Sequence, residues 1–144
     1  MRRLSLLSLF LYSPVAAQQP LSGFPVFDRV SIVGPVILTS LTRVEPPDWF
    51  RDVHADMEAC TGHTRSFDDI VWYSAILLVD LKMNSSMYAV YFSPGEHVSE
   101  NAIVMQRYFD NEVKLRQVVR HELVHYLAAP TNHDPTLFAK CVDA

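Results

Sequence analysis

The stretch VVRHELVHYLAAPTNHDP, residues 118–135, decides the fold. It holds three of the six histidines of the chain and one glutamate, and His121, Glu122 and His125 spell the pattern H-E-x-x-H. Residues four apart on an α-helix lie about 40° apart around the axis, so both imidazoles can reach one metal ion. Glu122 projects about 100° from His121 and can stand beside that ion as a base without binding it. The pattern predicts a zinc site with its own catalytic base.

The spacing of apolar residues predicts that this pattern lies on a helix over residues 111–129. Its core row recurs every four residues, and Pro130 ends it; the row consists of Leu115, Val119, Leu123 and Leu127. His and Glu each occur six times in the chain, so about 0.01 chance matches to the pattern are expected in a sequence of this composition. A helix whose histidines merely flank the core is the weaker alternative.

These residues resemble the zincin superfamily of zinc metallopeptidases. The resemblance implies a helix packed on a twisted sheet, one zinc ion held by His121 and His125, and Glu122 as the catalytic base. The stretches EACTG, IVWY, VVRHELVH and HDPTLFAKC, which span residues 58–141, are also similar to a pattern in small exported bacterial zincin-like proteins.

The third zinc ligand distinguishes the zincin subfamilies. No glutamate follows Glu122, so the glutamate-type arrangement is excluded. The metzincin pattern needs Gly at position 128 and His at 131, where this chain has Ala128 and Thr131. We therefore expect His133 as third ligand, with Asp134 as alternative ligand or as hydrogen-bond partner of a ligand. The remaining alternatives are that the third ligand is His54, His63 or His97, or that no third protein ligand exists.

The N-terminus has the features of a signal peptide over residues 1–17. Arg2 and Arg3 precede a short apolar run, and VAA ends at Ala17, as at a small-residue cleavage site. The run is too short to span a membrane, and no second apolar stretch of roughly 18 residues follows. We expect a secreted or periplasmic protein with a single domain over residues 18–144; an N-terminal membrane anchor is the alternative.

Composition and net charge limit the classes of molecule that the chain is expected to bind. The formal net charge is −4, and removal of residues 1–17 would take away two arginines and no acid. No basic cluster is present, which argues against nucleic acid and against stable association with an anionic membrane. We expect a monomer whose partner is a peptide or protein substrate.

The chain contains two cysteines, Cys60 and Cys141. An even count in an exported chain predicts one disulfide, which would close a loop of about 80 residues and stabilise the fold by at most about 4.5 kcal/mol. Two buried free thiols are the alternative. The bridge would hold the segment after His133 against the first helix.

The remaining pattern predicts an α+β domain, a small mixed β-sheet packed by an N-terminal helix and the H-E-x-x-H helix. The N-terminal helix lies within residues 45–62, with a buried stripe of Trp49, Val53, Met57 and Cys60. Strands are expected over residues 70–79, 87–92 and 101–109, and residues 30–41 fit an edge strand or two short pieces. On the zincin plan, the substrate-binding edge is the strand just before the helix, at Ala102, Ile103 and Val104.

The sequence thus predicts an exported zinc-dependent metallopeptidase with one Zn²⁺ ion. Two alternatives remain: an exported zinc-binding or interaction module with a zincin-like fold and no catalysis, or a zinc amidase that acts on cell-wall peptides.

Overall fold

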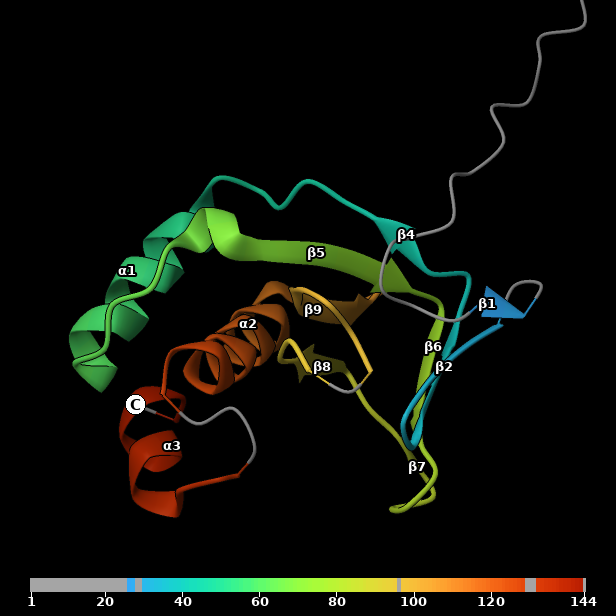
Figure 1. Cartoon of the computed structure of the whole chain (residues 1–144). Coiled ribbons are helices and arrows are strands. Elements are labelled where there is room, and N and C mark those ends of the chain that lie inside the picture. Colours follow the sequence, from blue (N-terminus) through green and yellow to red (C-terminus); the bar gives the residue numbers. More distant parts are fainter. Residues whose placement is uncertain (1–25, 28–29, 96, 129–131, 144) are drawn as a thin grey trace, which may run out of the picture.

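The computed structural model describes residues 26–27, 30–95, 97–128 and 132–143, and the expected signal peptide lies outside these ranges (Figure 1). Helices and strands are both present, which confirms the predicted α+β class. The helices are α1 (Trp49–Thr61), α2 (Glu112–Leu127) and α3 (Pro135–Cys141). The strands are β1 (Val26–Phe27), β2 (Val30–Val33), β3 (Val36–Thr39), β4 (Thr42–Arg43), β5 (Ile70–Ala75), β6 (Leu77–Asp80), β7 (Ser85–Ser86), β8 (Ala89–Phe92) and β9 (Asn101–Gln106). None of the described helices combines the length and the apolarity that crossing a membrane requires.

The strands form two sheets where the sequence predicted one. One sheet has the order β1-β2-β3-β6-β7 and is antiparallel throughout. The other has the order β4-β5-β9-β8, and it is mixed because β5 and β9 run parallel. In Figure 1 the helices lie on one side of the mixed sheet and the antiparallel sheet lies on the other.

The single strand predicted over residues 70–79 is wrong, because the chain changes sheets there. The carbonyl of Ala75 accepts a hydrogen bond from Arg107 N in the mixed sheet, whereas Ile76 N donates to the carbonyl of Thr39 in the antiparallel sheet. An uninterrupted apolar run has no periodicity that could reveal such a bend.

Residues 30–41 form the two short pieces that were one of the predicted alternatives. β2 and β3 pair as a hairpin, with Val33 opposite Val36. Gly34 occupies the turn with φ of +56°, a backbone conformation that favours glycine.

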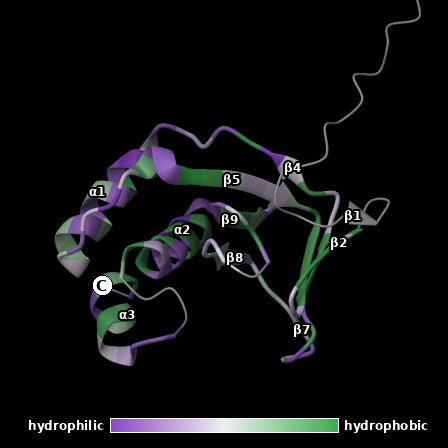
Figure 2. Ribbon diagram, viewed as in Figure 1, coloured by the Kyte–Doolittle hydropathy of each residue, from purple (hydrophilic) through white to green (hydrophobic). Residues whose placement is uncertain are grey.

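Two apolar cores result, one on each face of the mixed sheet (Figure 2). β9 contributes to both: Ile103 and Met105 pack under the helices, whereas Ala102 and Val104 face the antiparallel sheet. This explains why the strand is apolar at every interior position, as expected of a strand covered on both faces.

The position of β9 corrects one prediction. Ala102, Ile103 and Val104 were expected at the substrate-binding edge, but β9 lies between β5 and β8 and pairs with both. All three residues are fully buried. The edge strands of the mixed sheet are β4 and β8, and β8 contacts α2. β9, which directly precedes α2 in the sequence, lies in the interior of the sheet.

The two longer helices pack on the mixed sheet and on each other. The side chain of Asn111 caps α2 by accepting a hydrogen bond from Lys114 N, and Gly62 ends α1 with φ of +74°. Val53 and Met57 of the predicted stripe on α1 are buried. Trp49 is only partly buried, and Phe50 takes its place in the core.

Helix α3 was not predicted. Its N-cap is Asp134, whose side chain accepts hydrogen bonds from Thr136 N and Leu137 N. A disulfide joins Cys60 at the end of α1 to Cys141 at the end of α3, with their Cα atoms 5.7 Å apart. The end of α3 is therefore fixed to the end of α1.

Candidate metal centre

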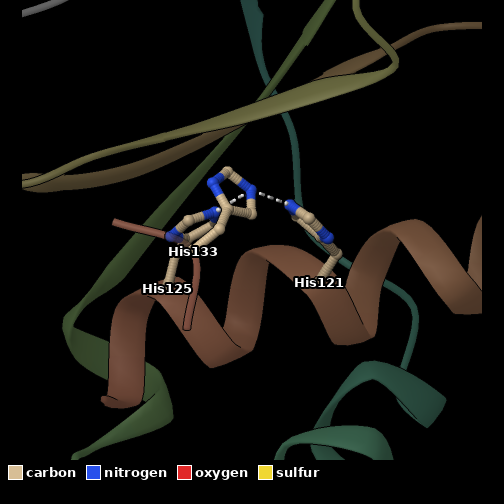
Figure 3. Close-up of side chains that lie close together, drawn as sticks. All are labelled: His121, His125 and His133. Atoms are coloured by element: carbon tan, nitrogen blue, oxygen red, sulfur yellow. Dashed lines mark hydrogen bonds between the residues drawn. The ribbon is translucent and has the colours of Figure 1, made fainter. Parts of the chain in front are cut away.

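Three imidazoles converge beside α2 (Figure 3). His121 and His125 are one helical turn apart on α2, and His133 approaches them from the segment that leads into α3. Nε2 of His133 lies 3.0 Å from Nε2 of His121 and 3.2 Å from Nε2 of His125. The three ring centroids lie 4.5–5.0 Å from one another, so the imidazoles form a triangle.

This spacing suits one tetrahedral metal ion. Zinc–nitrogen bonds of about 2.0–2.1 Å hold tetrahedral ligands about 3.3–3.4 Å apart. The ligand atoms of the three histidines all lie within 4.8 Å of one another, so small rotations of the rings suffice to complete such a site. Among the described residues, this is the group of potential ligands that converges closely enough to hold an ion.

The electrostatic environment favours the neutral imidazoles that a metal requires. Burial, together with the neighbouring rings of His125 and His133, lowers the pKa of His121 to about 4. At neutral pH His121 therefore keeps a lone pair available for a cation.

A single aromatic ring supports all three histidines. The ring centroid of Phe138 lies 4.7–4.9 Å from the centroids of the three imidazoles. Phe138 is itself buried, on α3. This role of Phe138 was not predicted from the sequence, because α3 is too short to show a clear helical period.

The side chain of Asp134 does not join the three imidazoles. Its Oδ1 accepts hydrogen bonds from Thr136 N at 2.9 Å and Leu137 N at 3.3 Å, which starts α3. The carboxylate thus orders the chain directly after His133. Its predicted role as an alternative ligand has no support in this arrangement.

Glu122 is buried next to this cluster, 5% exposed, and lines the same cleft as His121. Burial raises the pKa of its carboxyl to about 8, and a hydrogen bond from the backbone N–H of Tyr91 opposes that rise. A cation bound by the histidines would also lower this pKa, because it favours the charged carboxylate.

The hydrogen bond to Glu122 comes from the free edge of the mixed sheet. Gln106 N donates to the carbonyl of Tyr88. In this antiparallel pair, every second residue counted from Tyr88 therefore bonds to β9. Ala89 and Tyr91 then direct their N–H and C=O groups away from β9. The N–H of Tyr91 is one of these outward groups, and it reaches Glu122.

A side-chain network holds Tyr91 in place. Its hydroxyl donates to Oδ1 of Asn101 at 2.8 Å, and the same oxygen accepts from Nη2 of Arg65 at 3.2 Å. Nη1 of Arg65 donates to the carbonyl of Tyr126 near the end of α2. These three residues connect β8, β9 and α2 around the site, and the sequence contained no local signal for their contacts.

The other histidines that the sequence left open lie outside the cluster. His54 is buried on α1 against Phe67. His63 follows α1 and places Nδ1 3.1 Å from the carbonyl of Thr61. His97 lies beside Gly34 in the β2–β3 turn.

Comparison with protein-family models, with curated proteins and with solved structures found no match to this chain.

Proposed function

We propose that this chain binds one zinc ion through His121, His125 and His133 and hydrolyses peptide bonds with Glu122 as general base. The observation that carries the proposal is the juxtaposition of three converging imidazoles with the buried carboxylate of Glu122, which lines the same cleft as His121. Structural zinc sites have no need of such a carboxylate, whereas hydrolytic sites leave one ligand position open for water or substrate.

In the proposed hydrolysis, the zinc ion and the residues of the chain would have different roles. A bound zinc ion would lower the pKa of water towards about 7 and polarise a carbonyl group. Glu122 would accept the proton of the attacking water and later donate it to the leaving amine, a contribution typically of about 10²–10⁴-fold. The N–H of Tyr91 would orient the carboxylate for both transfers.

Strand β8, at the edge of the mixed sheet, is the proposed binding strand for the main chain of the substrate. Ala89 lines the cleft beside Glu122, and its N–H and C=O face away from β9. An extended peptide could pair with these groups by strand addition. This assignment replaces β9, which has no free edge.

Export remains part of the proposal. Disulfides persist in oxidising compartments, so a Cys60–Cys141 bridge fits a secreted or periplasmic protein.

One observation favours a second function, a zinc-binding module without catalysis. Glu122 is almost fully buried and already hydrogen-bonded to Tyr91, as a purely structural carboxylate would be. In that case the cleft would bind a partner and leave its peptide bonds intact.

One experiment separates the two functions. Residues 18–144 are loaded with zinc and incubated with a quenched peptide library and, in parallel, with cell-wall peptides. We expect one zinc per chain and cleavage that falls at least about 100-fold in Glu122→Gln, which keeps the shape of the side chain but cannot act as base. Zinc binding with equal, background-level cleavage in both proteins would instead support the binding module.

A further inference from the structure

A cleft of about 300 Å³ extends from the candidate metal centre along one face of α2. His121 and Glu122 lie at one end of it. Lys114 precedes His121 by seven residues, which on a helix puts it on the same face about 10 Å further along the axis. The cleft is lined by Tyr88, Ala89, Lys114, Gln117, Val118, His121, Glu122, Val142 and Asp143.

Lys114 supplies an uncompensated positive charge at the far end of the cleft. Its Nζ lies 4.6 Å from the ring centroid of Tyr88, which attracts the ammonium group without neutralising it. The side chain is half-buried, and within the described ranges no carboxylate lies at ion-pair distance from it. A lysine held in this way is available to a ligand.

The wall between the two ends is apolar. Val118 and Val142 are buried there. Methylene groups of a ligand would pack against them, and the exposed amide of Gln117 could donate a hydrogen bond near Lys114. This arrangement fits a side chain with an apolar stem and a negatively charged end.

Lys114 defines the orientation of such a side chain. It lies about 10 Å from His121 along the axis of α2, so the negatively charged end is attracted away from the candidate metal centre and towards Lys114. Asp143 also lines the cleft, and among the described residues it forms no ion pair with Lys114. Glutamate suits this better than aspartate because its extra methylene group reaches further towards Lys114.

We propose that this cleft selects peptides with a glutamate side chain next to the hydrolysed bond, and that Lys114 binds the carboxylate of that side chain. The inference rests on the proposed function, since the substrate main chain must lie along β8 beside Glu122. From there, alternate side chains of an extended peptide point towards the cleft.

The test compares cleavage rates of paired peptides that carry glutamate or glutamine at each position around the cleaved bond. We expect the zinc-loaded protein to favour glutamate at one adjacent position by about two- to fivefold, the range of a partly screened ion pair. Lys114→Met should abolish this preference, and Lys114→Glu should reverse it. Lys82→Glu, which makes the same charge change in the exposed turn after β6, should leave the ratio as it is. A preference that survives in both Lys114 variants, or equal rates for both peptides, would overturn the inference.

A binding measurement keeps this test independent of catalysis. Fluorescence anisotropy of the same labelled peptides with zinc-loaded Glu122→Gln reports recognition alone. If no peptide is cleaved, tighter binding of the glutamate peptide that is lost in Glu122→Gln/Lys114→Met still supports the cleft assignment, while the peptidase proposal fails. Equal binding of the two peptides would contradict the role of Lys114.

Discussion

The ring of Phe138 lies 4.8 Å from the ring of His133 and contacts the two imidazoles of α2 as well. The residue that supports the cluster is therefore on α3, beyond the segment that supplies the third imidazole. The geometry of the cluster depends on how α3 is held.

Phe138→Ala should weaken zinc binding by about 10–100-fold, the usual effect of losing a group that orients metal ligands. It should also destabilise the fold by about 3–5 kcal/mol, because it removes a buried ring. Competition with a chelator and urea denaturation measure the two effects. Phe138→Leu is the matched control: it keeps most of the apolar volume and should retain most of the stability. Wild-type zinc affinity in folded Phe138→Ala would show that the ring has no part in the site.

Replacement of Cys60 and Cys141 by serine should weaken zinc binding and lower the free energy of unfolding by up to about 4.5 kcal/mol. The disulfide fixes the end of α3 to α1, and without it the segment that includes His133 can move away from α2. Zinc retention during dialysis against a chelator measures the first effect. Retention equal to that of the wild type would mean that α3 packs correctly without the bridge.

Asn101→Leu should destabilise the protein by about 1–3 kcal/mol, because it leaves the buried hydroxyl of Tyr91 without its acceptor. Adding Tyr91→Phe removes that hydroxyl and should restore part of the loss. A double-mutant cycle by urea denaturation measures the coupling. Strictly additive effects of the two substitutions would contradict a direct interaction between Asn101 and Tyr91.

His54 should make stability depend on pH. Burial lowers its pKa, while Glu58 opposes that shift, and Nε2 of His54 has no hydrogen-bond partner among the described residues. Below the unfolded pKa of about 6.5 the unfolded chain takes up a proton that the folded chain resists. The stability of the wild type should therefore fall as pH drops from 6.5 towards the lower folded pKa, and it should be independent of this group above 6.5.

Urea denaturation of the wild type and of His54→Leu at pH 7.5 and 5.5 isolates this effect, because other titrating groups are common to both proteins. The difference in stability should shift in favour of His54→Leu at the lower pH. An unchanged difference would show that His54 is protonated equally in the folded and unfolded chains.

Local patterns in the sequence predicted the elements better than their arrangement. The period of apolar residues located α1 and α2, Pro130 marked the end of α2, and helical geometry predicted that His121 and His125 share a face. The structure also brings His133 to that face. The order of the strands could not be predicted in this way, because β9 precedes α2 in the chain but lies in the interior of the sheet. The change of sheet at Ile76 could not be predicted either, because the run that it interrupts is apolar throughout.

The contacts that support the site could not be predicted from the sequence either. The bond from Tyr91 to Glu122 uses a backbone N–H, which every residue type except proline provides. Arg65 and Asn101 are 36 residues apart in the chain, and only the folded packing of β9 against the loop after α1 brings them together. Phe138 required α3, whose seven residues are too few for a clear helical period.

The most direct measurement is the zinc content per chain of residues 18–144 after dialysis, compared with single alanine variants. The wild type should retain one zinc ion, and His121→Ala, His125→Ala and His133→Ala should each lose it while remaining folded by circular dichroism. His63→Ala, at an exposed position outside the cluster, should retain it. A wild-type protein without zinc, or undiminished zinc in the His133 variant, would contradict a metal centre built on these three imidazoles.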